Sequence, residues 1–154
     1  VVITIGANDF SYRHDDVTSG ACHADCLADT IQHVASVVTE IVATVHQLRA
    51  GEPTAVLLTG YWNVFEDGAV ARRLFPLAGL AASAELTEKV NNALHQVAVN
   101  NGAAYVDLYD VFDGPDAPGD VTTLLADDGD HPNAEGHGLI ARRLMAAGLP
   151  GLEF

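Results

Sequence analysis

The chain has 154 residues, close to the commonest size of a single domain, so we expect one compact core over residues 1–154. Hydrophobic residues make up 49% of it, which excludes an intrinsically disordered chain. Seven Lys and Arg against 21 Asp and Glu give a formal net charge of −14. This charge repels phosphates, so nucleic acid is not expected as a partner.

The first five residues predict a strand that starts at residue 1 itself. Residues Val1–Ile5 are apolar at four of five positions, as in a strand buried on both faces of a parallel sheet, and Gly6 ends it. The sequence does not begin with Met. We therefore expect the chain to be part of a longer protein. The polar stretch from Asn8 to Cys26 is expected to be a long loop.

Apolar periodicity predicts three helices and two further strands. Apolar residues recur every three or four positions in the expected helices, and each expected strand is a short apolar run. In chain order, these are helix 27–48, strand 55–58, a helix from Ser83 as N-cap to a stop at residues 100–102, strand 104–108, and a helix from Pro132 to Ala147. The last helix is expected to turn Leu139, Ile140, Leu144 and Met145 inward. The segment from the end of the second strand to Ala82 and the segment from Asp113 to Asp130 are expected to be irregular.

Strands that alternate with helices indicate a parallel α/β sheet with right-handed crossovers. Three strands leave both edges of such a sheet open, and a doubly wound domain has about five strands. We therefore expect roughly two βα units to be missing from the front of the chain. No apolar run approaches the roughly 18 residues of a membrane span, and none is expected.

Two polar clusters follow predicted strands, where ligands bind in open α/β sheets. Gly6-Ala7-Asn8-Asp9 comes directly after the first strand. The glycine lets the backbone turn sharply or approach a ligand, and the amide of Asn8 can donate to a developing negative charge. An Asx-type turn that only ends the strand is the alternative.

The second cluster is Asp128-Gly129-Asp130-His131-Pro132-Asn133. Pro132 keeps His131 out of helical geometry, on a constrained loop. Asp128, three residues earlier across a glycine turn, can reach the Nδ1 atom of the imidazole and leave Nε2 free as a general base. The alternative is an acid-rich helix cap without a chemical role.

In this order, the two clusters resemble the third and fifth sequence blocks of the SGNH, or GDSL, hydrolase superfamily of esterases and lipases. The resemblance implies a three-layer, flavodoxin-like fold with helices on both faces of the sheet. It also implies that a serine attacks an ester carbonyl, that His131 moves the proton, that Asp128 orients His131, and that Asn8 donates to the oxyanion. No cofactor and no metal are expected.

The chain departs from the family pattern at the nucleophile. The family carries it in a Gly-Asp-Ser block after the first strand, and no such block is present. The serines of this chain are Ser11, Ser19, Ser36 and Ser83. Of these, only Ser11 follows the first cluster closely. The nucleophile is therefore expected in an upstream segment of the same protein.

Cys22 and Cys26 are separated by three residues in the expected first loop. Secreted members of the resembled family often staple such loops, so a disulfide and export from the cell are expected, with two reduced thiols at a helix start as the alternative. A zinc site with His23 matches no common ligand spacing. Three acids, Asp127, Asp128 and Asp130, do not have the spacing of an EF-hand calcium loop.

Tyr61 and Trp62 follow the second strand, at the edge where the polar clusters are expected. They either line a substrate pocket or pack in the core. The leading hypothesis is a serine ester hydrolase that acts on small-molecule esters of lipids or acylated sugars. The alternatives are a catalytically inactive SGNH-like domain that binds acyl or carbohydrate groups, and a metal-dependent hydrolase that uses the acidic loop.

Overall fold

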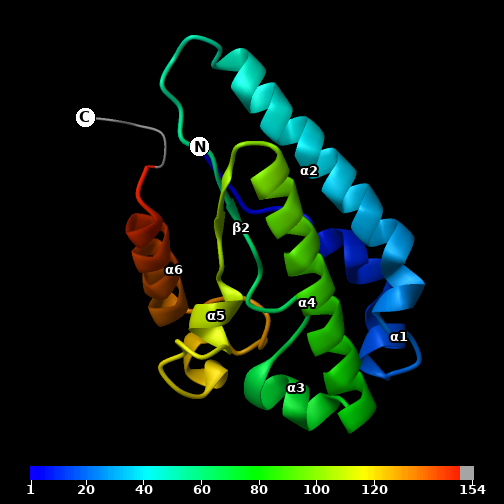
Figure 1. Cartoon of the computed structure of the whole chain (residues 1–154). Coiled ribbons are helices and arrows are strands. Elements are labelled where there is room, and N and C mark those ends of the chain that lie inside the picture. Colours follow the sequence, from blue (N-terminus) through cyan, green and yellow to red (C-terminus); the bar gives the residue numbers. More distant parts are fainter. Residues whose placement is uncertain (150–154) are drawn as a thin grey trace.

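The computed structural model describes residues 1–149, so the end of the expected domain, 150–154, lies outside the described residues. Three short parallel strands form one sheet in the order β1-β2-β3. They are β1 (Val2–Ile3), β2 (Leu57–Thr59) and β3 (Ala104–Val106). Val2 pairs with Leu57, and Leu57 pairs with Ala104. The predicted parallel α/β architecture is confirmed (Figure 1).

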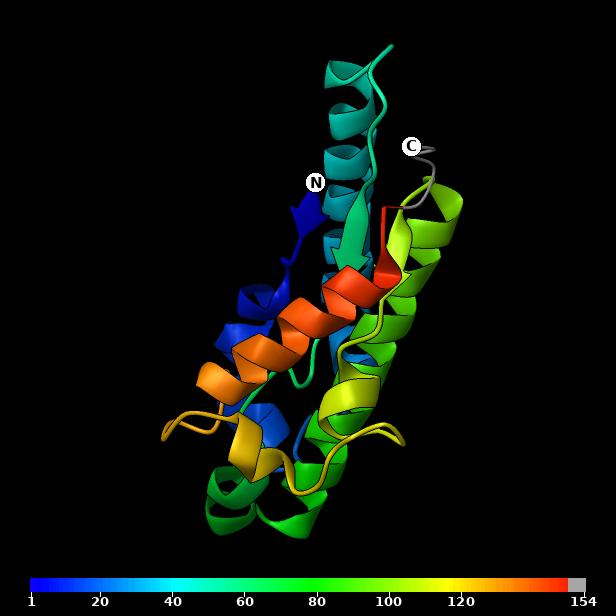
Figure 2. The same cartoon turned by 90° about the vertical axis from the view of Figure 1, so that its left-hand side faces the viewer.

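Helices cover both faces of this sheet (Figure 2). Helix α2 (Ala28–Leu48) and helix α4 (Leu77–Asn100) pack together on one face, where Val38, Leu58 and Val90 are buried in the largest apolar cluster. Helix α6 (Ala134–Ala147) covers the other face, where residues from β2 and β3 meet its apolar side. The result is a three-layer arrangement.

The first expected strand is shorter and more open than predicted. Only Val2–Ile3 pair with β2, and of the five apolar-run residues only Ile3 is buried. Val2 is 52% and Ile5 43% exposed. The prediction of burial on both faces was wrong because β1 is an edge strand, with a neighbour on one side only among residues 1–149.

The expected loop from Asn8 to Cys26 is largely helical, which corrects the prediction. It contains the 3-10 helix η1 (Ala7–Arg13), helix α1 (His14–Thr18) and the start of the 3-10 helix η2 (Ala24–Leu27). Phe10, Val17 and Leu27 are fully buried. Because each short helix contributes only one such residue, no periodicity announces it.

The segment between β2 and α4 also differs from the prediction, which expected it to be irregular. Helix α3 (Gly68–Leu74) lies within it, and α4 begins at Leu77 rather than at Ser83. Ser83 is therefore a buried residue inside a helix, where its hydroxyl donates to Asn63 Oδ1 at 3.1 Å. After β3, helix α5 (Tyr109–Phe112) and the 3-10 helix η3 (Val121–Leu124) were not predicted.

The two other predicted helices agree better. Helix α2 is confirmed to within one residue, and α6 starts after Asn133, whose side chain accepts from the N–H groups of Glu135 and Gly136. Pro132 thus precedes the cap rather than opening the helix. Gly148, with φ 68°, ends α6 as expected. Met145 does not point inward, since it is 80% exposed.

One helical segment, Asp25–Leu48, is long and apolar enough to cross a membrane by length and composition alone. The expectation that no segment meets this criterion is therefore corrected. A core helix of a folded domain passes the same test, and Val34, Val38 and Val42 of this segment are buried.

Candidate active site

A pocket of about 280 Å³ lies at the carboxyl edge of the sheet. Its walls come from three segments, residues 4–9 after β1, residues 61–64 after β2, and residues 130–131 before α6. Asn8 and His131, which come from opposite ends of the sequence, both line it. Gly6, Tyr61 and Trp62, the predicted substrate-binding residues, line it too.

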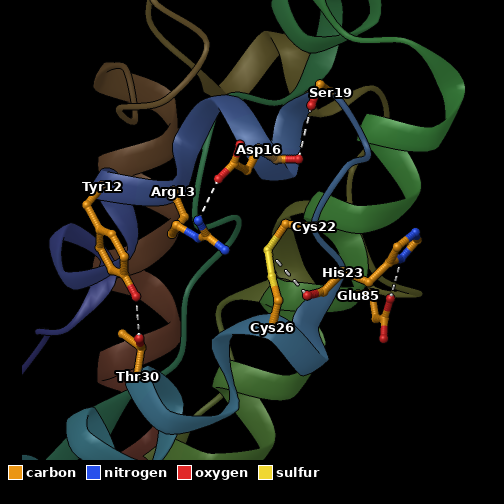
Figure 3. The surroundings of a disulfide bond; sticks show 9 residues. All are labelled: Tyr12, Arg13, Asp16, Ser19, Cys22, His23, Cys26, Thr30 and Glu85. Atoms are coloured by element: carbon orange, nitrogen blue, oxygen red, sulfur yellow. Dashed lines mark hydrogen bonds and ion pairs between the residues drawn. A yellow bond between two sulfur atoms is a disulfide. The ribbon is translucent and has the colours of Figure 1, made fainter.

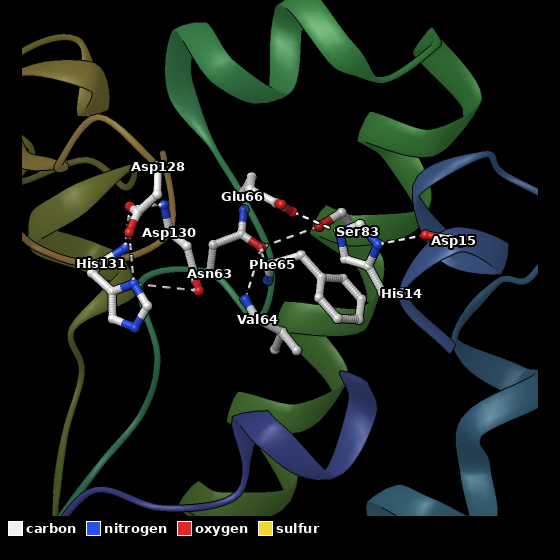
Figure 4. Close-up of polar contacts among 10 residues, drawn as sticks. All are labelled: His14, Asp15, Asn63, Val64, Phe65, Glu66, Ser83, Asp128, Asp130 and His131. Carbon is white, nitrogen blue, oxygen red and sulfur yellow. Dashed lines mark hydrogen bonds and ion pairs between the residues drawn. The ribbon is translucent and has the colours of Figure 1, made fainter. Parts of the chain in front are cut away.

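The imidazole of His131 is held by Asp128 (Figure 4). His131 Nδ1 and Asp128 Oδ2 are 2.9 Å apart. Because a carboxylate only accepts, Nδ1 carries the proton in this bond and Nε2 is the basic nitrogen of the neutral ring. Asp128 Oδ1 also accepts from the backbone N–H groups of Asp130 and His131, both at 3.0 Å. Within residues 1–149, Nε2 has no hydrogen-bond partner.

These contacts shift the pKa of both partners in opposite directions. The backbone N–H groups of Asp130 and His131, followed by the imidazole, lower the pKa of Asp128 to about 2. The hydrogen bond to Asp128 and the nearby charge of Asp130, whose carboxylate lies 3.7 Å from Nδ1, raise the pKa of His131 above 6.5. An ionised Asp128 beside the imidazole is the arrangement that a general base requires.

The glycine turn at residue 6 positions Asn8. Gly6 has φ 119°, and a Cβ there would lie 2.7 Å from Val34 Cγ1 on α2, so no other residue fits without a shift. The N–H of Ala7 donates to the Tyr61 hydroxyl at 3.1 Å, which fixes the turn to the neighbouring strand end. The side chain of Asn8 is exposed and makes no hydrogen bond to the described residues. Its amide is thus available to a ligand in the pocket.

Trp62 supports the loop that carries His131. Its Nε1–H donates to the backbone carbonyl of Asp130 at 2.8 Å. The indole stacks on Phe112 with ring centroids 5.4 Å apart. Pocket lining and core packing, which were alternatives from the sequence, are therefore combined in this residue.

Asn63 is a site residue that the sequence analysis missed. Its Oδ1 accepts from Ser83 and Thr87 on α4, and its Nδ2 donates to Asp67 at 3.0 Å. The N–H of Asp67 in turn donates to the carbonyl of Gly129 at 2.7 Å. This chain of bonds ties the Asp128–His131 loop to the core helix α4. The only sequence signal was an amide within an aromatic run.

A second histidine lies beyond this network (Figure 4). His14 Nε2 is 2.8 Å from Glu66 and Nδ1 is 2.9 Å from Asp15. Burial lowers the pKa of His14, but the hydrogen bonds to Asp15 and Glu66 outweigh it, and the net shift is upward. His14 therefore joins α1 to the loop after β2. It is not among the residues that line the pocket.

A disulfide joins Cys22, which follows α1, to Cys26 on η2 (Figure 3). Their Cα atoms are 6.0 Å apart. The residues between them pair with α4, since His23 Nδ1 lies 3.0 Å from Glu85 and Asp25 lies 2.8 Å from Lys89. Neither cysteine lines the pocket that holds His131.

No serine lines the pocket in the described part of the chain. Ser11 lies on η1 and Ser19 donates to the carbonyl of Asp16, while Ser36 is on α2 and Ser83 is committed to Asn63. Among residues 1–149, no three His, Cys, Asp or Glu side chains are grouped to hold a metal ion. The acidic loop around Asp128 thus offers no such ligand set.

A larger cavity, of about 430 Å³, lies between α4 and the end of β3. Glu85, Glu88, Asp107, Tyr109 and neighbouring alanine and asparagine residues line it. It contains no histidine and no hydroxyl nucleophile other than a tyrosine. We therefore place the candidate site in the smaller pocket, where the chemically suited residues converge.

The fold and the pocket define a three-layer α/β domain with an Asp–His pair at the carboxyl edge of its sheet. A family model described as the GDSL-like Lipase/Acylhydrolase family matches residues 1–139. The chain therefore belongs to this family, which confirms the resemblance seen in its motifs. No curated protein matches the chain.

Solved structures with the same fold include two bacterial enzymes. A catalytic mutant of Axe2, an acetylxylan esterase from Geobacillus stearothermophilus, is 18% identical with a TM-score of 0.61, over 100% of this chain and 61% of that chain. Phospholipase A1 from Streptomyces albidoflavus NA297 is 21% identical with a TM-score of 0.63, over 96% of this chain and 68% of that chain. The chain thus spans about three fifths to two thirds of these relatives.

Proposed function

We propose that this chain forms the acid–base and oxyanion part of a serine ester hydrolase. The observation that carries the proposal is the pocket that Asn8 and His131 both line. In it, His131 Nδ1 is hydrogen-bonded to Asp128, and Nε2 has no hydrogen-bond partner among the described residues. A neutral imidazole with one nitrogen fixed by a carboxylate is the usual base for a hydroxyl nucleophile.

The chemistry follows from these positions. His131 Nε2 takes the proton of a serine hydroxyl as its oxygen attacks the ester carbonyl, and the Asn8 amide donates to the oxyanion that forms. The imidazolium, stabilised by Asp128, then protonates the departing alcohol. Water, deprotonated by the same nitrogen, releases the acid from the acyl-enzyme.

We propose that the serine comes from a segment of the same protein outside residues 1–154. In its support, none of the four serines of this chain lines the pocket. The outer edge of β1 is unpaired among the described residues, and Val2 on β1 and Ile5 just after it are exposed, so this edge offers backbone groups to which a further strand could pair. Such pairing would bring new strand ends beside Asn8.

For the substrate, we propose small carboxylic esters of lipids or acylated sugars. The aromatic pair Tyr61 and Trp62 in the pocket wall supports an apolar or sugar-ring contact. The printed names of the structural relatives, an acetylxylan esterase and a phospholipase A1, cover these two kinds of ester. The disulfide between Cys22 and Cys26 supports a location outside the cell.

A second candidate is a catalytically inactive domain that binds acyl or carbohydrate groups. The same observation, a pocket without a serine among the described residues, favours it. The two candidates differ in one respect. The hydrolase requires a reactive serine elsewhere in the protein, whereas the binding domain requires none.

The experiment is covalent labelling with a fluorophosphonate, which reacts with activated serines. Residues 1–154 alone should remain unlabelled, and a longer form of the protein that includes the preceding segment should be labelled at one serine. In that form, His131→Ala should lower turnover of a soluble p-nitrophenyl ester by about a thousandfold or more. His33→Ala, an exposed histidine on α2, should leave turnover unchanged. Labelling within residues 1–154, or unchanged turnover in His131→Ala, would refute the proposal.

A further inference from the structure

An apolar tip projects where α3 turns into α4. We call residues 72–78 the α3–α4 tip. Leu74 is 58% and Leu77 is 85% exposed, and Pro76 between them is exposed too. Leu74 is the last residue of α3 and Leu77 the first residue of α4, and Figure 1 shows this junction at one end of the molecule. Exposed aliphatic side chains three residues apart at one end of a domain fit an interaction site.

The tip has the opposite charge to the rest of the molecule. Two of the seven basic residues of the chain, Arg72 and Arg73, stand next to the leucines. Arg72 is paired with Asp120 at 2.8 Å. Among residues 1–149, no carboxylate lies within 4.0 Å of the Arg73 guanidinium, while the chain as a whole carries −14. An unpaired cation beside exposed leucines fits a surface that presents both phosphate and hydrocarbon.

Helix α3, which leads into the tip, is hydrogen-bonded to η3, and the residue before it is hydrogen-bonded to the loop that carries His131. The N–H of Asp67, just before α3, donates to Gly129 at 2.7 Å, and the N–H of Ala69 donates to Thr122 Oγ1 at 2.9 Å. Val70 packs against Gly129, which stands between Asp128 and His131. Figures 1 and 2 both show α3 at the end of the molecule toward which the strands point. The tip and the pocket therefore belong to the same end.

We propose that the α3–α4 tip docks on the surface of zwitterionic phospholipid aggregates, with Leu74 and Leu77 entering the interface and Arg73 contacting phosphate. A strongly anionic surface is disfavoured because the charge of −14 is repelled by it. A second copy of the chain is disfavoured because the seven residues of the tip are far fewer than the roughly 20–30 residues that each partner contributes to a stable interface. The choice of lipid as the surface that supplies the ester rests on the proposed function. The docking itself needs no catalysis.

The test is sedimentation of residues 1–154 with sucrose-loaded phosphatidylcholine vesicles. The wild-type chain should sediment with the vesicles, and Leu77→Ser should bind about tenfold more weakly because one buried leucine is lost. Arg73→Glu should also weaken binding. The matched controls are Leu48→Ser, at the far end of α2 and 79% exposed, and Arg142→Glu on α6, and both should bind like the wild type. Unchanged circular dichroism shows that each variant is folded.

Three results would overturn the proposal. They are a wild-type chain that stays in the supernatant at millimolar lipid, a loss of binding in Leu48→Ser equal to that in Leu77→Ser, and a dimer in the absence of vesicles that Leu77→Ser converts to a monomer. The last result would assign the tip to a second copy. Because sedimentation measures binding and not turnover, failure of fluorophosphonate labelling would leave this test intact, and the reverse also holds.

Discussion

At the scale of single residues, Asp128 sets the state of His131. The carboxylate accepts from Nδ1 and from two backbone N–H groups, which keeps its own pKa at about 2 and raises that of the imidazole. Asp128 is therefore ionised at every pH at which His131 titrates. His131 must be neutral to accept a proton, so it acts as a base only at pH values above its raised pKa.

Asp128→Asn tests this relation directly. The amide cannot stabilise the imidazolium, so the pKa of His131 should fall, and the titration of its ring protons by NMR should move to lower pH. An unchanged midpoint for His131 would mean that the hydrogen bond between Asp128 and Nδ1 is absent in solution.

The same shifts fix the direction of the stability change with pH. The depressed pKa of Asp128 stabilises the fold above the unfolded value of 3.8, and this contribution is lost as the pH falls toward about 2. The raised pKa of His131 stabilises the fold at low pH and is lost as the pH rises through the folded value. Both groups are exposed, so both contributions are small.

The position of His131 could be read from the sequence because its constraints are local. Asp128, Gly129 and Pro132 lie within four residues of it, and the turn that they form is the one found. Asn63 could not be read in this way. Its partners Ser83 and Thr87 lie on α4, 20 and 24 residues further along the chain, and only tertiary packing brings them to Asn63.

At the scale of elements, the segment after β2 holds the 128–131 loop in place. Trp62 and Asp67 each donate to a backbone carbonyl of that loop, at Asp130 and Gly129. The loop has little support of its own, since Asp128 and His131 are both largely exposed. Its geometry therefore depends on a neighbouring element.

Trp62→Phe keeps an aromatic ring against Phe112 but removes the donor to Asp130. The free energy of unfolding should fall by about 1 kcal/mol, the net value of one such hydrogen bond. Urea denaturation followed by circular dichroism measures this, since the chain has no second tryptophan for fluorescence. We also expect faster amide exchange at His131. Equal exchange in both proteins would show that Trp62 does not support the loop.

The disulfide acts on the junction between α1 and α2. It closes a loop whose inner residues His23 and Asp25 pair with α4. For a loop this short, the reduced chain should be less stable by about 2 kcal/mol. Urea denaturation with and without a reducing agent measures the difference. Mass spectrometry without reduction should find two hydrogen atoms fewer than the sequence requires, and a full complement would show free thiols.

The long elements were predictable and the short ones were not. Helix α2 is predictable from apolar spacing over six turns, and the C-terminal end of α6 is predictable from Gly148. Helix α3 and the three short helical segments before α2 lack enough turns to give a periodic pattern. The start of α4 was missed because alanines and a glycine dilute its apolar stripe.

At the scale of the whole molecule, the parallel sheet brings distant residues together. Because the strands are parallel, Asn8 after β1, Tyr61 after β2 and His131 before α6 meet at one edge. The alternation of strands and helices predicted this meeting. The strong exposure of β1 was not predictable, because an apolar run looks the same in a central strand and in an edge strand.

The central claim is that the Asn8 amide and the His131 imidazole act on one ester carbonyl. The most direct measurement is a crystal structure of the longer protein after its reactive serine has been phosphonylated. We predict that the phosphoryl oxygen accepts a hydrogen bond from Asn8 Nδ2 and that His131 Nε2 lies within hydrogen-bond distance of the serine oxygen. An adduct that contacts neither side chain would contradict the account.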